Sequence, residues 1–248
     1  MTLSEFFTSH PRAALGLSGG VDSACLLSAA LACGAEVRPY FVKTAFQPEF
    51  ELEDARAVCQ KLGVELTVLE WDVLSCAQVT ENSPRRCYHC KHLIFGLLAE
   101  QASRDGFSLL LDGTNASDDA GDRPGMQALR ELSVRSPLRE CGLTKAEVRR
   151  LAREAGLPCW DKPAYACLAT RIPTGEAITA DKLKKTQKSE AYLMSLGLRD
   201  FRVRFHHGCA RLQVAGGELP LLLRHREEIL AALGEDYEAV LLDLEVRP

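Results

Sequence analysis

The stretch AALGLSGGVDSACLLSAALACG, residues 13–34, decides the first unit of the fold. Residues 13–18 form a short apolar run that ends in a turn signal, and residues 21–34 carry Leu and Ala at helical spacing up to a terminal glycine. The pattern predicts a strand, a glycine-rich loop and a helix. In a parallel sheet such a loop offers backbone N–H groups and a helix N-terminus to an anion. The residues expected to bind phosphate there are Ser18, Gly19, Gly20, Asp22 and Ser23.

Strand-like and helix-like segments alternate after this loop. Strands are expected at 36–44, 64–71 and 107–115, and helices at 50–63, 90–106 and 143–157. Thr144 and Glu147 have the spacing of a capping box at the start of the last helix. Residues 123–138 are punctuated by Pro and Arg, and we expect them to be irregular. The alternation predicts an α/β fold with a parallel sheet.

The pattern changes beyond residue 157. Four Pro and Gly residues interrupt the segment 158–178, which we interpret as a functional linker. The remaining segment predicts a small α+β module, with helices at 179–197 and 219–234 and strands at 202–207, 210–214 and 237–245. The predicted domains are therefore 1–157, the linker 158–178, and the module 179–248.

Composition bounds the class of protein. Hydrophobic residues make up 46% of the chain and charged residues 26%, and no apolar run reaches the roughly 18 residues that span a membrane. No secretory signal is visible, so a cytoplasmic location is expected, in which the ten cysteines stay reduced. Cys25, Cys33 and Cys59 lie among apolar residues on expected helices and are interpreted as core residues. The net charge of −4 argues against a protein that wraps nucleic acid.

A second polar segment, DGTNASDD at residues 112–119, follows the expected strand at 107–115. Its loop should lie at the same carboxyl edge of the sheet as the glycine-rich loop. Gly113 would allow close approach of a nucleotide, while Thr114 and Asn115 would contact it. Asp118 or Asp119 would bind magnesium directly or through water, and Asp22 is a further candidate ligand.

The motif RCYHCK, residues 86–91, places Cys87 and Cys90 on one face near a helix start, so that both thiols can reach one metal or cluster. Cys167 lies in the irregular linker close to Arg171, where a cation can lower a thiol pKa. Three thiolates leave one iron of a [4Fe–4S] cluster open. A zinc site completed by a neighbouring histidine and a Cys87–Cys90 redox pair are the alternatives.

The phosphate loop resembles the SGGxDS signature of the PP-loop pyrophosphatases, which use ATP to adenylate a carbonyl or carboxyl oxygen. SGGVDS, RCYHCK, DGTN, CLATRIPTGEAIT and RVRFHHGCARLQV, in this order, together resemble the LarE-type ATP-dependent sulfur transferases. This resemblance covers nearly the whole chain. It implies ATP and Mg²⁺ as cofactors and conversion of a carboxylate of pyridinium-3,5-biscarboxylic acid mononucleotide to a thiocarboxylate, for nickel-pincer nucleotide biosynthesis.

The resemblance also implies a sulfur source. One branch of the family sacrifices the sulfur of a single cysteine, at the position that matches Cys167. The other branch holds a [4Fe–4S] cluster on three cysteines, which match Cys87, Cys90 and Cys167, and its open iron carries a transferable hydrosulfide. Because all three cysteines are present, the resemblance favours the cluster branch for this chain.

The substrate of that family carries a phosphate, so further cations are needed. Arg202 and Arg204 alternate along an expected strand and should share one face, and Arg171 and Arg211 could join them. The alternative is a solvated strand face. Glu190 resembles an acidic position near the substrate in the family.

Rival hypotheses remain open at this point. A tRNA-thiolating PP-loop enzyme would need a basic surface to bind RNA, and the net negative charge argues against one. A synthetase of the NAD-synthetase type would leave the cysteines without a role. A nucleotide-binding module with a structural zinc would bind ATP without turnover. The expected partners are a small nucleotide substrate and further copies of the chain, since the family forms homo-oligomers.

Overall fold

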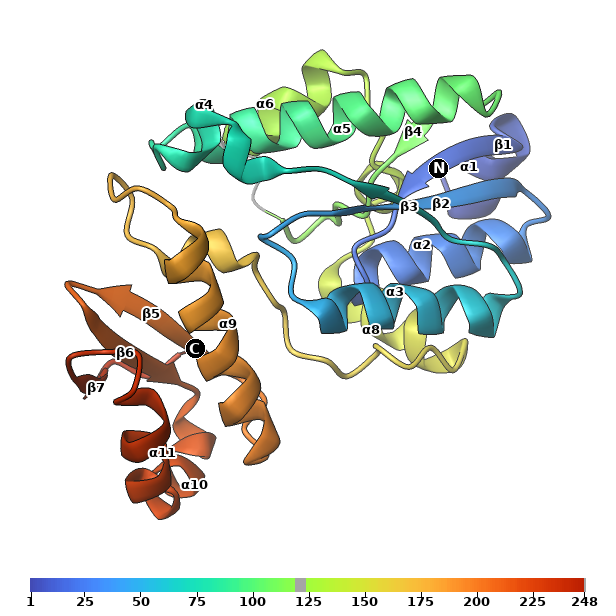
Figure 1. The fold of residues 1–248 in the computed structure, drawn as a ribbon. Coiled ribbons are helices and arrows are strands. Elements are labelled where there is room, and N and C mark those ends of the chain that lie inside the picture. The colour runs from blue at the N-terminus through green and yellow to red at the C-terminus, as the bar shows by residue number, and fades with distance from the viewer. Residues whose placement is uncertain (119–123, 248) are drawn as a thin grey trace. The chain divides into compact units, whose positions relative to one another are not determined.

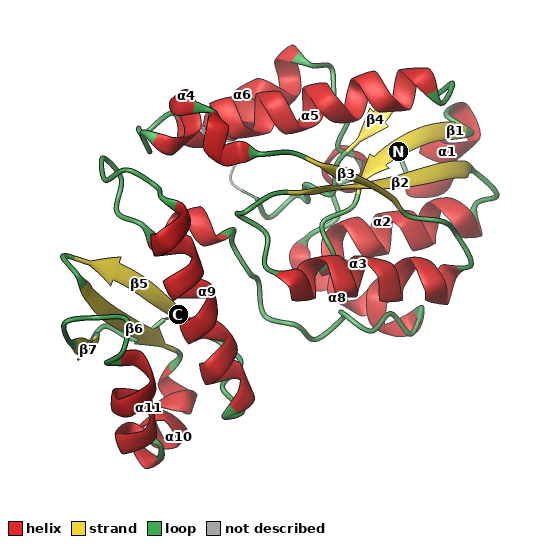
Figure 2. Cartoon of the chain, viewed as in Figure 1, coloured by secondary structure: helices red, strands yellow, loops and turns green. Residues whose placement is uncertain are grey.

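The computed structural model describes residues 1–118 and 124–247 and has the predicted α/β class (Figure 1; Figure 2). Its larger sheet has four parallel strands in the order β3-β2-β1-β4. Their bounds are β1 Arg12–Gly16, β2 Glu36–Lys43, β3 Thr67–Glu70 and β4 Leu110–Leu111. A smaller sheet of three strands follows in the C-terminal part of the chain. The fold prediction is therefore confirmed.

Helices cover both faces of the parallel sheet (Figure 1). Ala13 and Leu15 of β1 belong to a core that includes α1 (Leu3–Ser9), α2 (Val21–Ala32), α3 (Glu49–Leu62), α7 (Pro137–Glu140) and α8 (Lys145–Glu154). Ala14 points to the opposite face and packs in a cluster with Leu98 and Ala102 of α5 (Arg86–Arg104). Both faces of β1 are buried, which explains why its sequence is apolar throughout.

Three local expectations are corrected by the structure. Residues 124–131, expected to be irregular, form α6 (Pro124–Glu131), whose Ala128 and Leu129 are buried. Proline fits the first position of a helix because its missing N–H has no helical acceptor there. The expected helix at 219–234 is broken at His225 into α10 (Leu219–Arg224) and α11 (Arg226–Leu233), and the last strand is only β7 (Val240–Leu242).

The chain forms two compact units that are not continuous in sequence. The first contains residues 1–72 and 85–164, and the second contains residues 73–84 and 165–248. Thus a segment with η1 (Val73–Ser75) and α4 (Ala77–Thr80) belongs with the C-terminal part of the chain. The predicted boundaries at residues 157 and 178 stay predictions.

Asn82 attaches the segment 73–84 to the second unit. Its buried side-chain amide donates to the carbonyl oxygens of Ile172, Pro173 and Glu176 at 3.3, 2.8 and 3.0 Å. In addition, the Gly175 N–H donates to the Asn82 carbonyl at 2.9 Å. One asparagine therefore provides hydrogen-bond donors for three carbonyl groups of this turn.

The second unit is built around the small sheet in the order β5-β6-β7. Strands β5 (Phe201–His206) and β6 (Cys209–Val214) are antiparallel, and β7 is parallel to β6. Helices α9 (Ala180–Ser195), α10 and α11 pack in the same core through Leu193, Leu222 and Ile229. Two short 3-10 helices, η2 (Leu168–Arg171) and η3 (Gly216–Glu218), complete this unit.

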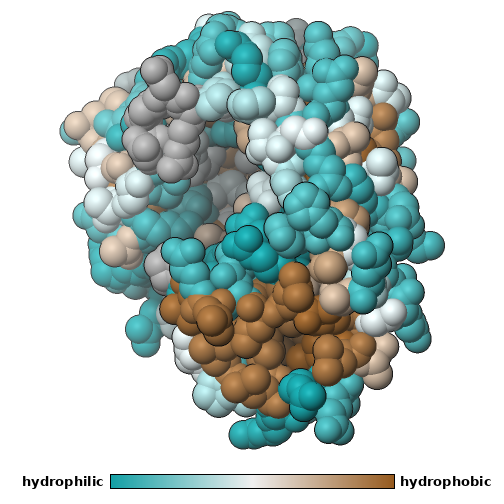
Figure 3. Space-filling view, turned by 90° about the vertical axis from the view of Figure 1, so that its left-hand side faces the viewer, coloured by the Kyte–Doolittle hydropathy of each residue, from teal (hydrophilic) through white to brown (hydrophobic). Residues whose placement is uncertain are grey.

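Apolar side chains gather on the surface of the second unit (Figure 3). The exposed ones on α10, α11, β7 and the following segment are Leu223, Leu230, Leu241, Leu244 and Val246. Among the described residues, no helix is both long enough and apolar enough to cross a membrane.

Candidate functional site

The phosphate loop has a preformed geometry. Ser23 Oγ accepts a hydrogen bond from the Ser18 N–H at 3.1 Å and donates to the Gly20 carbonyl at 3.3 Å. Gly19 has φ of 77°, and a Cβ atom there would lie only 2.4 Å from the carbonyl oxygen of Glu51. Gly19 is thus required both by its backbone conformation and by the contact with α3. The loop leads directly into the N-terminus of α2.

The DGTN segment packs against this loop. A Cβ atom at Gly113 would lie 2.7 Å from the backbone nitrogen of Ser23, so only glycine allows the two loops to approach so closely. Asp112, which is 5% exposed, accepts hydrogen bonds from Thr114 Oγ1 and, at 2.5 Å, from Ser136 Oγ. This network fixes the direction of the loop after β4.

Asp22 links the two loops. Its Oδ1 accepts from Asn115 Nδ2 at 3.1 Å, and its Oδ2 lies 2.5 Å from Lys145 Nζ. The Asn115 N–H donates to Asp118 Oδ2 at 2.9 Å. The structure therefore brings Asp22, Asn115 and Asp118 together as the sequence predicts, and it adds Lys145. Asp119, the other candidate magnesium ligand, lies outside the described residues.

Cys87 lies beside the DGTN segment. It lines a cavity of about 360 Å³ together with Thr114, Asp118 and Lys91, and with residues 124–126 of α6. This volume is within the range of small-molecule sites. Cys90 follows one helical turn later on α5 and is partly exposed. Both thiols of RCYHCK thus lie on an exposed part of the helix.

The other cysteines divide into buried and exposed thiols. Burial raises the pKa of Cys25 to about 12 and that of Cys59 to about 11, as expected for core residues. Cys33 is exposed at the C-cap of α2, so its assignment to the core was wrong. Cys33 is the C-cap residue, beyond the last helical position Ala32, so helical spacing no longer sets the direction of its side chain.

Cys167 lies at the N-cap of η2 and is partly exposed. Its carbonyl accepts from the Thr170 N–H at 3.0 Å and from Thr170 Oγ1 at 2.9 Å. Arg171 Nη1 donates to the Ala166 carbonyl at 2.9 Å, and Arg204 Nη1 donates to the Thr170 carbonyl at 2.8 Å. The backbone on both sides of the thiol is therefore held by arginine side chains.

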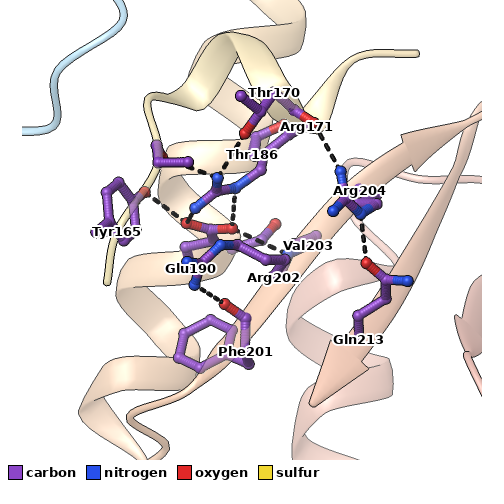
Figure 4. Close-up of polar contacts among 12 residues, drawn as sticks. Tyr165, Thr170, Arg171, Thr186, Glu190, Phe201, Arg202, Val203, Arg204 and Gln213 are labelled. Atoms are coloured by element: carbon purple, nitrogen blue, oxygen red, sulfur yellow. Dashed lines mark hydrogen bonds and ion pairs between the residues drawn. The ribbon is translucent and has the colours of Figure 1, made fainter. Parts of the chain in front are cut away.

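A buried ion pair anchors this arrangement (Figure 4). Arg171 Nε and Nη2 donate to the two carboxylate oxygens of Glu190 at 2.7 and 3.0 Å. Glu190 also accepts from Tyr165 OH at 2.5 Å and from the Val203 N–H at 2.9 Å. A carboxylate with four donors is fully compensated, which is what allows it to be buried. The sequence reasoning missed Tyr165, because a tyrosine in an irregular segment has no pattern that signals a polar partner.

The strand arginines have different surroundings. Arg204 lies opposite Arg211 in the antiparallel register, and its Nε donates to Gln213 Oε1. Arg211 is paired with Asp243, at 2.6 Å between Nη2 and Oδ2. Burial, and then the positive charge of neighbouring arginines, lowers the pKa of Arg202 to about 10. Burial, and then the same positive neighbours, also lowers the pKa of Arg204, so this part of the second unit gathers several arginines.

The described parts of the chain contain no group of three or more His, Cys, Asp or Glu side chains placed to hold a metal ion. Cys87 and Cys90 belong to the first unit and Cys167 to the second.

The fold and the phosphate loop define a PP-loop, ATP-using class of protein, and comparisons with known proteins agree. Residues 12–84 match the family described as queuosine biosynthesis protein QueC. The pyridinium-3,5-bisthiocarboxylic acid mononucleotide synthase of Lactiplantibacillus plantarum is 32% identical over 248 residues, which cover 98% of this chain and 89% of that protein. The chain belongs to the family of that synthase.

Two further relatives differ in how much of the chain they match. The uncharacterized protein slr1717 of Synechocystis is 38% identical over 86% of this chain and 80% of that protein. The tRNA-specific 2-thiouridylase MnmA of Thermotoga maritima is 26% identical over 58% of this chain and 52% of that protein. The similarity to the tRNA enzyme is thus lower and covers less of the chain than the similarity to the mononucleotide synthase.

Proposed function

We propose that this protein is an ATP-dependent sulfur transferase that converts a carboxylate of pyridinium-3,5-biscarboxylic acid mononucleotide to a thiocarboxylate. The observation that carries the proposal is the identity of 32% with the mononucleotide synthase over 98% of the chain. The phosphate loop and its polar neighbours supply the machinery for activation by ATP. The product would serve nickel-pincer nucleotide biosynthesis.

The first step activates the carboxylate. A carboxylate oxygen attacks the α-phosphorus of ATP, the bond from that phosphorus to the bridging oxygen breaks, and pyrophosphate leaves with the electron pair. Backbone N–H groups between Ser18 and Ser23, Thr114 and Asn115 would bind the nucleotide, and Asp22 and Asp118 would bind Mg²⁺. These groups stabilise the charge that moves onto pyrophosphate. A sulfur nucleophile then attacks the acyl carbon, and AMP leaves.

The arginines of the second unit are the proposed substrate-phosphate residues. Arg202 is supported by its place on β5, where it is buried near further arginines that could bind an anion together with it. Arg204 and Arg211 lie opposite each other on the same sheet. Arg171 and Glu190 are already engaged with one another, so within this proposal they position the segment around Cys167.

The sulfur source is proposed to be a [4Fe–4S] cluster on Cys87, Cys90 and Cys167. The chemistry of the three donors suits such a cluster, since iron–sulfur clusters are held by thiolates and each of these thiols is at least partly exposed within its own unit. When bound, the cluster would supply a hydrosulfide from its open iron. The protein's part is to hold the thiolates and to place the activated carbonyl near Cys87, in the cavity that Thr114 and Asp118 also line.

A second candidate keeps the reaction and changes the donor. Cys167 alone would give up its sulfur, leaving dehydroalanine and making the protein a single-turnover reagent. The hydrogen bonds from Arg171 and Arg204 to the backbone on either side of Cys167 favour this thiol as a positioned nucleophile.

Anaerobic reconstitution with iron and sulfide tests the donor. The wild type should take up about four irons, and Cys87→Ala, Cys90→Ala and Cys167→Ala should each lose them, whereas Cys33→Ala, which removes an exposed thiol outside the site, should not. Zinc uptake without iron, or full activity of Cys87→Ala and Cys90→Ala, would overturn the cluster proposal. Loss of 34 mass units from Cys167 after one turnover would establish the sacrificial donor, since the elements of H₂S leave the residue.

The substrate proposal has its own assay. With ATP, Mg²⁺, a sulfide source and the dicarboxylate mononucleotide, the protein should release pyrophosphate and AMP and form the thiocarboxylate, detected by mass spectrometry. Unmodified tRNA, supplied in place of the mononucleotide, should give no thiolated product. ATP binding without pyrophosphate release in either reaction would favour a non-catalytic nucleotide-binding module.

We also propose that the exposed apolar face of the second unit binds a second copy of the chain. Leu223 and Leu230 are 55% and 41% exposed, and β7 is the edge strand of the small sheet, with no further strand on its outer side among the described residues. Size-exclusion chromatography with light scattering should show an oligomer that Leu230→Glu dissociates. Arg104→Glu, an exposed change on α5, is the matched control, and a monomeric wild type would contradict this proposal.

A further inference from the structure

Lys145 lies beside the phosphate loop, and the reaction outlined above gives it no role. It is the first residue of α8, and its Nζ lies 2.5 Å from Oδ2 of Asp22, in the first turn of α2. Asp22 uses its other oxygen to accept from Asn115 of the DGTN segment. The ammonium group of Lys145 is thus located at the junction of the two nucleotide loops.

The position of Lys145 is set by a rigid element. The capping box of Thr144 and Glu147 starts α8 immediately before it, and Val148 and Ala152 of the same helix are fully buried in the core. The Lys145 N–H also donates to Ser117 Oγ at 2.9 Å, which ties the helix start to the DGTN segment. The side chain itself stays 32% exposed, so a ligand can reach it.

The pairing has an electrostatic consequence for ATP. The phosphate loop attracts anions through backbone N–H groups and the N-terminus of α2, but Asp22 adds a negative charge in that same turn. A carboxylate there repels the triphosphate unless a cation compensates it. Lys145 provides this compensation before nucleotide binds. If Asp22 held Mg²⁺ as proposed above, the ammonium group of Lys145 would be free to contact phosphate oxygens.

We propose that Lys145 binds the pyrophosphate portion of ATP, exchanging Asp22 for a β- or γ-phosphate oxygen, and stabilises the leaving pyrophosphate. A lysine suits this exchange because its ammonium group is a compact point charge on a flexible stem. The proposal rests on the proposed adenylation, since it concerns the same ATP site. It adds a binding residue for the leaving group that the sequence motifs do not include.

Equilibrium binding of ATP and AMP separates this role from a structural one. Lys145→Met should weaken binding of ATP by about tenfold or more, since it removes a charge-assisted hydrogen bond to phosphate, and should leave AMP binding within about twofold. Lys145→Arg should restore most of the ATP affinity. Lys61→Met is the matched control, because Lys61 lies in the last turn of α3, at the opposite end of that helix from the contact with Gly19.

Two outcomes would overturn the proposal. Equal ATP affinity in the wild type and Lys145→Met would show that Lys145 does not contact phosphate. Equal loss of ATP and AMP binding would show a general disruption of the site. The melting temperature of each variant identifies a folding defect, and Lys145→Arg then supplies the decisive comparison. These assays use ATP and AMP alone, so they stay informative if the wild type forms no thiocarboxylate. In that case the sulfur-transfer proposal fails and the Lys145 proposal is judged separately.

Discussion

Glu190 and Arg171 form a two-point ion pair in the second unit, with side chains 2% and 0% exposed. The same arginine bonds to the backbone at Ala166, and the same carboxylate accepts from Val203 on β5. The pair therefore connects α9, the strand β5 and the segment that carries Cys167. This connection makes the fold of the module and the placement of the thiol depend on one another.

Removing one partner of this pair should be costly. Glu190→Ala leaves a buried guanidinium without its carboxylate, and we expect a loss of roughly 3–5 kcal/mol in the free energy of unfolding. Urea denaturation monitored by circular dichroism measures it. Glu235→Ala breaks an exposed ion pair with Lys188 and should cost far less, because solvent screens such pairs. Similar losses for the two variants would contradict the anchoring role of Glu190.

Alanine substitutions should have opposite effects at a glycine of the DGTN segment and at a glycine inside a helix. Gly113→Ala forces a Cβ atom to 2.7 Å from the Ser23 nitrogen, so the loops must move apart and ATP affinity should fall by about tenfold or more, the effect of a lost charge-assisted contact. Gly96→Ala lies in the interior of α5 with nothing within 4 Å of the new Cβ, and should stabilise the protein by roughly 0.8–1 kcal/mol. Calorimetric titration with ATP and thermal melting measure the two effects. Unchanged ATP binding by Gly113→Ala would refute the close packing of the loops.

Thiol labelling should follow burial and pH. With a pKa of about 12, Cys25 has a thiolate fraction about a thousandfold lower than an ordinary thiol at pH 8, so iodoacetamide should modify Cys33 and Cys87 first. Labelling of Cys25 should increase as the pH rises toward 12. Peptide mass spectrometry measures the order, and unfolding in guanidinium should make all thiols react alike. Native Cys25 reacting as fast as Cys33 would sink this prediction.

The same raised pKa values have a consequence for stability. The thiols of Cys25 and Cys59 ionise near their ordinary pKa of about 8.5 in the unfolded chain but only near 12 and 11 in the folded protein. The unfolded state therefore loses protons first as the pH rises. The stability contributed by these two neutral thiols is fully present below about pH 8.5 and should decrease above it. Denaturation midpoints between pH 7 and 10 measure the slope, and Cys25→Ala should reduce it.

Asn82 should be essential to the second unit. Asn82→Asp keeps the shape but removes the two amide donors that serve the carbonyls of Ile172, Pro173 and Glu176, so we expect destabilisation of at least about 1–3 kcal/mol. Asn115→Asp changes an asparagine of the nucleotide loop and should affect ATP binding more than stability. Chemical denaturation of both variants tests the contrast. A fully stable Asn82→Asp protein would show that the segment 73–84 is held by other contacts.

Much of the fold is legible in local patterns. The apolar run before SGGVDS, the helical spacing after it and the Thr144–Glu147 capping box all specify structure within a few residues, and each occurs as expected. The glycines of the phosphate loop were likewise recognisable, because their motif encodes a backbone requirement. Asp22, Asn115 and Asp118 were expected at one sheet edge, since parallel strands end there together.

Other features depend on contacts between distant residues, and the sequence could not reveal them. In the sequence Lys145 cannot be told from any surface lysine on a helix. It meets Asp22, which is 123 residues away in the chain, because α8 packs beside α2. Arg171 and Glu190 are charged residues of the kind that usually lie on the surface. They are buried here because four donors converge on one carboxylate. No helix or strand was expected at 73–84, and the hydrogen bonds from Asn82 to the carbonyls of Ile172, Pro173 and Glu176 form only in the folded unit.

The sequence by itself determined the class of fold, the phosphate loop and the order of the chemical motifs, because each depends on local backbone preferences and hydrophobic periodicity. The tertiary structure decided which side chains of those motifs meet, which charges are buried and which thiols are exposed. Cys33 shows the difference: the helical pattern fits a core residue, but its position at the C-cap of α2 exposes it. Burial and pairing arise from the whole packing arrangement, and these set the electrostatics on which the proposed chemistry depends.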